Sequence, residues 1–405
     1  FGISFWQATY AAVIGTVGSF ALVAISSLAG KKSNAPTMTL SRAIFGVKGN
    51  IVPGLLSYLI FVGWETVLVS LATLATGTVF AEFGHINKDL AQVLGFLFAA
   101  GLTIFSGVFG FKVIMRIQRY LTIATIILSL GYVLLTINKI NWSAVSAIKS
   151  GSSQGLIGAI IFGVTGIGLG WVNSAADYSR YLPRHVSNRG VIGWTIFGAS
   201  LVPILMVIYG ALLAGSSKKL SDAIAIDPIG ALTTLLPKWY LIPFALVAIL
   251  GLIGGSILDL YSSGIALVPK PSSAASDVYK RQAKNFFGPF QGFLITLGVP
   301  IAVWSAMFVA DVLIRKTYIE SDLFNPNGIY GSWDKGAIVI LIVGTIIGWG
   351  FVTNSFASWL SWQGYLLSLL GGKSGSWAGT NIGIIFALIV GFIGQYILTR
   401  KKPRD

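Results

Sequence analysis

The sequence predicts an all-α, polytopic membrane protein whose single transmembrane domain spans residues 1–405. Hydrophobic residues make up 55% of the chain and charged residues only 10%, whereas a soluble domain carries about 25% charged residues. The hydrophobic residues are gathered into ten stretches, each close to the roughly 20 residues that cross a bilayer as a helix. These stretches cover residues 3–30, 51–80, 91–111, 113–137, 156–177, 190–215, 239–268, 286–314, 336–354 and 377–399.

The charges between the stretches predict how the helices cross the membrane. The loop after the first stretch carries Lys31, Lys32, Arg42 and Lys48, whereas the loop after the second carries Lys88 alone. Such alternation follows the positive-inside rule, which places basic loops in the cytoplasm. We therefore interpret the net charge of +15 as a topology signal rather than a nucleic-acid-binding surface, and we expect a plasma membrane protein of the bacterial inner-membrane type.

The alternation fails beyond residue 284. Ten helices would place Arg315 and the basic tail around Arg400 outside the cell. One additional helix between residues 268 and 286 restores the rule and puts the C-terminus in the cytoplasm. Segment 269–285, which begins P-K-P-S-S-A-A-S-D-V-Y-K-R-Q-A-K, is the most polar part of the chain. We interpret it as a non-native scar that replaces a native helix; the alternative is a cytoplasmic loop followed by a re-entrant segment.

The sequence contains few residues that could bind a metal ion or catalyse hydrolysis. The chain contains no cysteine, and its two histidines, His85 and His185, lie near predicted helix ends. Thiolate metal sites and cysteine nucleophiles are thereby excluded, and no nucleophile and base pair is evident. We expect no enzyme activity, no metal and no cofactor.

One predicted helix is interrupted. Residues 163–184 read G-V-T-G-I-G-L-G-W-V-N-S-A-A-D-Y-S-R-Y-L-P-R within an apolar surround. Glycines and polar residues at this depth free backbone N–H and C=O groups from the helix, which is tolerated where they line a cavity or touch a ligand. The pattern predicts a transporter's substrate site.

Two acidic residues fall in the middle of predicted spans. Glu65 follows Trp64 in V-G-W-E-T, and Asp259 lies in G-L-I-G-G-S-I-L-D-L-Y-S-S-G. A carboxylate at this depth costs roughly 2.5–3.5 kcal/mol, so it needs a partner, water or a bound proton. Both are candidates for proton coupling. The alternatives are a protonated carboxyl of Glu65 bonded to a neighbouring helix and a helix-packing hydrogen bond from Asp259.

Two further acidic residues lie near the ends of spans and have a basic residue within one helical turn. Asp177 precedes Arg180, and Asp311 precedes Arg315. Residues at this spacing are neighbours on a helix surface. We expect an ion pair in both cases.

Two tryptophans lie deep in their spans rather than at the interface. Trp64 has about a dozen apolar residues on each side, and Trp171 follows the glycine-rich interruption. Two indoles on different helices can hold a flat ring between them. The alternative for each is simple packing within the bundle.

Several motifs together resemble the nucleobase:cation symporter-1 family, and its purine–cytosine permease branch in particular. They run in the family's order over nearly the whole chain except 269–285. The motifs are T-L-S-R-A-I-F-G-V-K-G-N (39–50), V-G-W-E (62–65), G-W-V-N-S-A-A-D-Y-S-R-Y-L-P (170–183), L-Y-S-S-G (260–264), P-F-Q-G-F-L-I-T-L-G-V-P-I-A-V-W (289–304) and D-L-F-N-P-N-G-I-Y-G (322–331).

The resemblance implies a fold of the leucine-transporter type, with two inverted five-helix repeats and two further helices. On that template the visible spans are helices two to eight and ten to twelve. The ninth helix coincides with segment 269–285, and the first would precede Phe1, which opens directly into an apolar run. We therefore expect a chain that begins within a longer protein.

The resemblance also implies a substrate site. Trp64 would stack on the base, and Gly170 and Trp171 would contact it from the interrupted helix, where Asn173 is a further candidate. Asp259 stands where many relatives have asparagine, and Leu68 where an amide is common. Both departures change the expected specificity, because an ionised aspartate only accepts hydrogen bonds and favours a ligand rich in N–H donors.

The coupling ion follows from the same alignment. Sodium-coupled relatives use hydroxyl groups of the eighth helix at the positions of Ile253 and Gly254, which carry none. Sodium is disfavoured, and we expect proton coupling through Asp259 or Glu65.

The expected function is secondary active import of a nucleobase or related planar heterocycle by cation symport and alternating access. The partners are the small-molecule substrate and the lipid bilayer, without nucleic acid, and the oligomeric state stays open. The alternatives are a passive channel and a truncated transporter without function. A channel predicts aligned polar faces along several helices, whereas the polar residues here cluster at three places, in the interrupted helix, around Glu65 and around Asp259.

Overall fold

The computed structural model describes the chain apart from residues 85–86, 108–110, 227, 267–286, 357 and 402–405. Over the described residues, eight helices are long and apolar enough to cross a membrane, and two shorter apolar helices accompany them. These ten coincide with the ten predicted spans. The polar segment 269–285, and with it the prediction of a replaced helix, lies outside the described residues.

The long helices are continuous in nine of the ten spans. Their bounds are α1 (Phe5–Ser33), α4 (Ile51–Gly84), α5 (Lys88–Gly107), α6 (Phe111–Thr136), α10 (Asn188–Ser216), α13 (Leu241–Ala266), α14 (Phe287–Ile314), α15 (Lys335–Gly350) and α16 (Gly383–Lys401).

The remaining span is divided into four pieces. It consists of α8 (Ser153–Gly163), the π-helical η2 (Val164–Gly168), the 3-10 helix η3 (Leu169–Ser174) and α9 (Ala175–Ser179).

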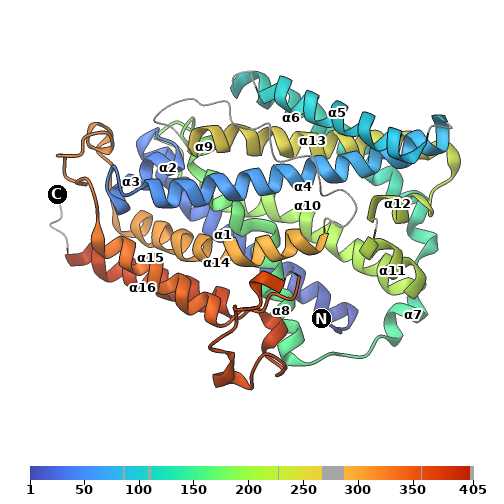
Figure 1. Ribbon diagram of the computed structural model, residues 1–405. Helices are drawn as coiled ribbons and strands as arrows, with labels where there is room; N and C mark the ends of the chain where they lie inside the picture. The colour runs from blue at the N-terminus through green and yellow to red at the C-terminus, as the bar shows by residue number, and fades with distance from the viewer. Residues whose placement is uncertain (85–86, 108–110, 227, 267–286, 357, 402–405) are drawn as a thin grey trace.

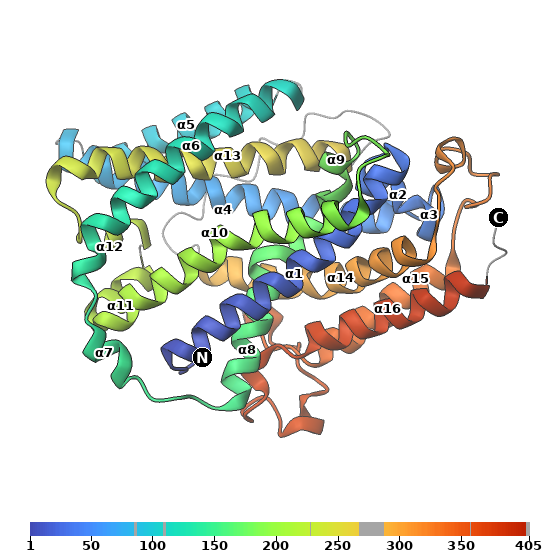
Figure 2. The same cartoon turned by 180° about the vertical axis from the view of Figure 1, so that it is seen from behind.

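Short helices occupy the two ends of the bundle. Length and hydropathy did not predict them from the sequence. At one end lie α2 (Thr37–Leu40) and α3 (Arg42–Phe45), together with the start of α15 and the end of α16. At the other lie α7 (Trp142–Ala147), α11 (Lys218–Ile226) and α12 (Pro228–Thr233) (Figures 1 and 2). We call the first end the basic end, because Lys31, Lys32, Arg315 and Arg400 lie there.

Burial separates central helices from peripheral ones. In the apolar 18-residue stretch of each helix, 72% of the residues are buried in α14 and 61% in α1. In α10 and α6 only 17% and 11% are buried. A helix that leaves apolar side chains exposed in this way is suited to contact with lipid. The core of the bundle therefore forms around α1 and α14.

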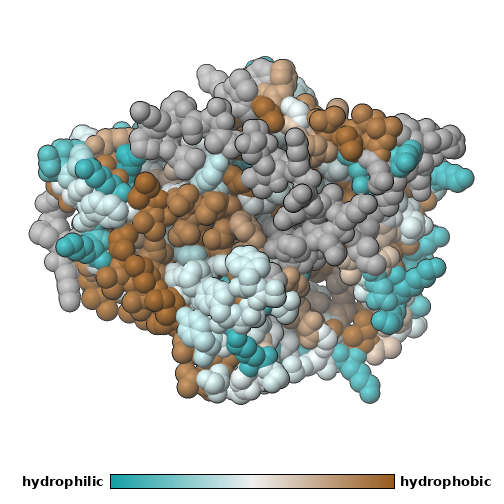
Figure 3. Space-filling view, in the orientation of Figure 1, coloured by the Kyte–Doolittle hydropathy of each residue, from teal (hydrophilic) through white to brown (hydrophobic). Residues whose placement is uncertain are grey.

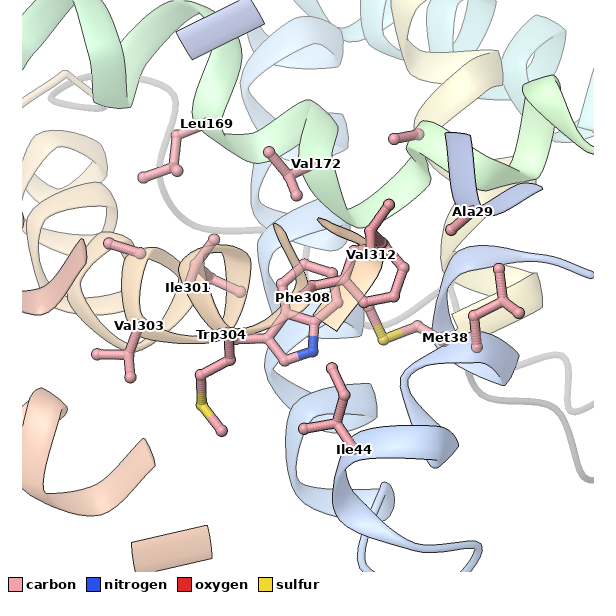
Figure 4. Close-up of a cluster of buried hydrophobic side chains, with 14 of the residues drawn as sticks. Ala29, Met38, Ile44, Leu169, Val172, Ile301, Val303, Trp304, Phe308 and Val312 are labelled. Atoms are coloured by element: carbon pink, nitrogen blue, oxygen red, sulfur yellow. The ribbon is translucent and has the colours of Figure 1, made fainter. Parts of the chain in front are cut away.

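Aromatic side chains of α14 fill the core beside the interrupted helix. Trp304 and Phe308 stack with ring centroids 5.3 Å apart and are almost fully buried. They lie among Met38 of α2, Ile44 of α3 and Val172 of η3 (Figure 4). The Trp304 indole N–H donates to the Ser41 hydroxyl at 2.9 Å, so the one polar atom of the ring is satisfied.

Glycines let α1 approach the interrupted helix closely. A Cβ atom placed on Gly15 would lie 2.7 Å from the carbonyl oxygen of Ile160 and 3.1 Å from Cα of Gly163. One placed on Gly30 would lie 2.8 Å from Cα of Ala176. Since any larger side chain would push the helices apart, these glycines set the position of the interruption against α1.

Candidate functional site

The predicted interruption is present at the glycine-rich motif. After Gly163 the backbone passes through one π-helical segment and one 3-10 segment before it becomes α-helical again at Ala175. A π turn widens the helix and a 3-10 turn tightens it, so carbonyl and amide groups lose their regular partners. Asn173 compensates for one of them, since its side-chain N–H donates to the Gly170 carbonyl oxygen at 3.0 Å.

Trp64 of α4 lies against this interruption. A Cβ atom placed on Gly170 would lie 3.4 Å from Nε1 of Trp64, so the bare glycine backbone and the indole are neighbours. Trp64 and Trp171 are both partly buried, and both pack against the hydrophobic cluster that contains Trp304. The structure thus brings the two predicted tryptophans and Gly170 to one region of the core.

The two mid-span carboxyl groups lie on helices that pack against each other, Glu65 on α4 and Asp259 on α13. Glu65 is 4% exposed and Asp259 is 6% exposed. Leu68, one turn after Glu65, packs on α13: a Cβ atom placed on Gly255 would lie 2.9 Å from its Cδ1. Leu68 therefore meets α13 one turn before Asp259.

Two buried polar groups near these residues lack a hydrogen-bond partner. One is Oδ1 of Asn173, which is 1% exposed; the other is the hydroxyl of Ser256, which is fully buried. Ser256 lies three residues before Asp259, so it shares a helix face with that carboxyl group. The spacing is the signal in the sequence that would have identified Ser256, which residue-by-residue reasoning missed.

The expected ion pair between Asp177 and Arg180 is wrong. Asp177 is 2% exposed, and its Oδ1 accepts the backbone N–H of Thr37 at 2.9 Å. In return the Thr37 hydroxyl accepts the backbone N–H of Ala176 at 2.9 Å. The carboxylate thus turns inward to the first N–H of α2, which has no partner within its own helix.

Arg180 makes its hydrogen bonds to groups other than the Asp177 carboxylate. Its Nε donates to the backbone oxygen of Asp177 at 3.2 Å, and its Nη2 donates to the hydroxyl of Tyr261 at 3.1 Å. The neighbouring Tyr178 hydroxyl lies 3.4 Å from the Leu258 carbonyl oxygen and from the Ser262 hydroxyl. The short helix α9 is therefore bonded to both α2 and α13.

The expected ion pair between Asp311 and Arg315 is confirmed. Arg315 donates from Nη2 to Oδ1 at 2.8 Å and from Nε to Oδ2 at 2.9 Å, and Asp311 is fully buried. Tyr318 donates its hydroxyl to Oδ2 at 3.0 Å. Burial, and then the charge of Asp311, hold the pKa of Tyr318 well above its ordinary value, so this phenol stays a donor.

Ile253 and Gly254, where the resemblance led us to look for sodium ligands, both make contacts within the protein. Ile253 is 2% exposed and packs in an apolar cluster with Ile114 and Ile257. The Gly254 carbonyl oxygen accepts a hydrogen bond from Nε2 of Gln118 on α6 at 2.6 Å. Among the described residues, His, Cys, Asp and Glu form no group of three or more that could hold a metal ion.

A bundle of membrane-spanning helices around one interrupted helix, with Trp64 beside the interruption, is typical of a membrane permease. The chain belongs to the family of permeases for cytosine and purines, uracil, thiamine and allantoin, whose sequence profile matches residues 1–377. The expected family is thereby confirmed. Because the members of this family are permeases, the expectation that the chain is not an enzyme is confirmed as well.

Two curated relatives carry the corresponding names. A Bacillus subtilis protein named for purine–cytosine permease activity, YxlA, is 23% identical over 100% of this chain and 87% of its own length. The purine-cytosine permease FCY2 of Saccharomyces cerevisiae is 22% identical over 52% of this chain and 39% of its own length.

Solved structures establish the fold. A structure of Mhp1, a nucleobase-cation-symport-1 family transporter in a closed conformation with bromovinylhydantoin bound, matches with a TM-score of 0.64 and 15% identity. The match covers 99% of this chain and 87% of that one. An inward-facing conformation of Mhp1 matches with a TM-score of 0.60 and 16% identity, over 99% of this chain and 86% of that one. The leucine-transporter-type fold is confirmed.

Proposed function

We propose that this permease imports a nucleobase or related planar heterocycle by proton symport and alternating access. The observation that carries the proposal is that Trp64 lies next to Gly170 of the interrupted helix, 3.4 Å from the position of a Cβ atom there. An aromatic face next to freed backbone groups suits a flat ring with polar edges. Trp171 and Asn173 are the further substrate contacts that we propose on the interrupted helix.

Alternating access is supported by the bonds that hold α9. Thr37 of α2 and Ser262 of α13 both bond to residues of α9, so the interrupted helix is fastened at the basic end of the bundle. A path from the site to this end requires these bonds to break. The fact that Mhp1 has been solved in closed and inward-facing conformations supports the same type of transition here.

Proton coupling is supported by the two buried carboxyl groups and by the hydrogen bond that the Gly254 carbonyl already accepts. Glu65 and Asp259 are nearly fully buried on two helices that pack against each other, and a carboxylate buried at membrane depth costs free energy. One bound proton relieves this cost. The Gln118 amide occupies the Gly254 carbonyl, which removes an oxygen from any cation site on α13.

Counterflow in proteoliposomes tests the transport proposal. Vesicles are loaded with unlabelled cytosine, adenine, guanine, uracil or allantoin and diluted into a trace of the same labelled compound. We expect labelled substrate to accumulate transiently above equilibrium for at least one compound, because only a carrier exchanges substrate against a gradient. Equilibration without this overshoot would identify a channel, and flux equal to that of protein-free vesicles for every compound would refute transport.

Ion gradients test the coupling proposal on the same vesicles. We expect an inwardly directed proton gradient to raise the initial uptake rate and a protonophore to abolish the increase. A sodium gradient at constant pH should leave the rate unchanged. Stimulation by sodium alone would overturn proton coupling while leaving nucleobase transport intact.

A further inference from the structure

A groove between α15 and α16 opens at the basic end of the bundle, away from the interrupted helix. Its volume is about 420 Å³, within the range of about 300–1,000 Å³ that is typical of small-molecule sites. The walls are Val339 and Ile340 of α15 and Ile397 and Leu398 of α16, and Lys335 lies at the mouth. Figure 3 shows apolar side chains over this face, with hydrophilic ones at the edge near the C-terminus.

The pairing of the two helices places the basic residues at one end of the groove. A Cβ atom on Gly336 would lie 3.0 Å from Cδ1 of Leu398, so the first turn of α15 meets the last turns of α16. Lys335 precedes Gly336, and Arg400 follows Leu398 by two residues; both are exposed. Arg400 also lies over the ring of Tyr396, with Cζ 4.3 Å from the ring centroid.

One acidic residue, Asp334, lies beside these basic residues. It caps α15, and its Oδ1 accepts the backbone N–H of Ala337 at 2.9 Å and lies 3.3 Å from a Cβ atom placed on Gly336. The partial positive charge of the helix N-terminus offsets a carboxylate in this position. The groove therefore combines apolar walls with two cationic side chains and one capping carboxylate at its basic end.

We propose that this groove binds an anionic phospholipid, with the phosphate at Lys335 and Arg400 and one acyl chain along Val339 and Ile397. The apolar walls suit a hydrocarbon chain and exclude a soluble anion as the complete ligand. Basic groups at a membrane surface attract anionic headgroups by about 1 kcal/mol each. The charge pattern thus favours an anionic lipid over a neutral one and over an apolar face of a second copy of the chain.

Native mass spectrometry of the purified full chain tests this proposal. The protein is titrated with phosphatidylglycerol or with phosphatidylcholine of identical acyl chains. We expect the first phosphatidylglycerol to bind about thirtyfold more tightly than phosphatidylcholine, which is the ratio expected from two basic contacts. Lys335→Ala should reduce this preference to about fivefold, because Arg400 remains, and Lys335→Arg should retain it in full.

Matched substitutions separate the groove from its surroundings. Val339→Trp fills the groove from an exposed position and should lose the tight phosphatidylglycerol site, whereas Val343→Trp, one turn further along α15 and also exposed, should keep it. Lys373→Ala removes a lysine that does not line the groove and should have no effect.

Three outcomes would overturn the proposal. The first is equal affinity for the two lipids, and the second is unchanged phosphatidylglycerol binding in both Lys335→Ala and Val339→Trp. The third is a dimer that Val339→Trp dissociates, because a second copy would then occupy the groove. Melting curves of the variants confirm that each is folded, and Lys335→Ala, at an exposed surface position, decides the result if Val339→Trp is unstable.

Discussion

Trp64 of α4 lies beside Gly170 of the interrupted helix. A Cβ atom on Gly170 would sit 3.4 Å from Nε1 of the indole, which is ordinary van der Waals contact. Glu65, the next residue after Trp64, and Asp259 are almost fully buried. We propose that ring stacking and charge act together on one bound molecule.

Removal of the second tryptophan tests the stacking contribution. Trp171→Ala should weaken substrate affinity about two- to tenfold, since an aromatic pair contributes about 0.5–1.5 kcal/mol beyond the area it buries. Binding is measured by a thermal-shift titration with the transported base. The control is Trp194→Ala, because Trp194 is 74% exposed on α10. Unchanged affinity in Trp171→Ala would refute stacking by this residue.

Substitution of one carboxyl group tests the coupling. Asp259→Asn removes a titrating group and supplies an N–H donor, so we expect counterflow exchange to continue while stimulation by a proton gradient is lost. Any preference for guanine over hypoxanthine, which lacks the exocyclic amino group, should fall as well, because an amide offers one acceptor oxygen where a carboxylate offers two. Asp222→Asn, at an exposed helix position, is the control. Normal proton stimulation in Asp259→Asn would assign coupling to another group.

At the scale of elements, the junction of α14 with α1 and α3 depends on one buried ion pair. Asp311 accepts both bonds of Arg315, which also donates from Nη2 to the Ala43 carbonyl oxygen at 3.3 Å. Lys32 of α1 donates to the backbone oxygens of Val312 and Arg315 at 3.1 and 3.3 Å. Charge and backbone bonds together join three segments that are remote in sequence.

Loss of the arginine should destabilise this junction strongly. Arg315→Met leaves Asp311 buried without its partner, for which about 3–5 kcal/mol is typical. The double variant Asp311→Asn with Arg315→Met should be more stable than Arg315→Met, because no uncompensated charge remains. Thermal unfolding in detergent measures both. Lys218→Met, which removes an exposed ion pair with Asp222, should change little, and an equally small effect of Arg315→Met would contradict this account.

The contacts of the interrupted helix depend on segments that are distant in the sequence. Its glycines predict an interruption, yet the contact of α9 with α2 through Thr37 and Asp177 has no local signal, because the partners are 140 residues apart. Sequence spacing instead suggested Arg180 as the partner of Asp177. In the structure the Asp177 carboxylate is buried and accepts a hydrogen bond from the N-terminus of α2 instead of pairing with Arg180.

At the scale of the whole molecule, one end of the bundle is basic and carries the short helices α2 and α3. We propose that this end faces the cytoplasm of a cell whose plasma membrane holds the protein. Because the chain has no cysteine, single introduced cysteines can report on this orientation.

A membrane-impermeant maleimide should label Ser374→Cys in intact cells, since Ser374 lies in the exposed loop at the opposite end from the basic residues. His185→Cys, in the exposed loop before α10, should react only after permeabilisation. The unsubstituted chain is the control. Reaction of His185→Cys in intact cells, with protection of Ser374→Cys, would reverse the proposed topology.

The sequence by itself determined the class, the ten spans and the position of the interruption, because hydropathy, charge and glycine content act locally and require no knowledge of partners. It also identified the family and the candidate residues Trp64, Gly170 and Asp259. Only the tertiary structure decided which groups meet: Gln118 with Gly254, Thr37 with Asp177, and α15 with α16 around a groove. These contacts join distant segments, and their geometry follows from helix packing rather than from any local pattern.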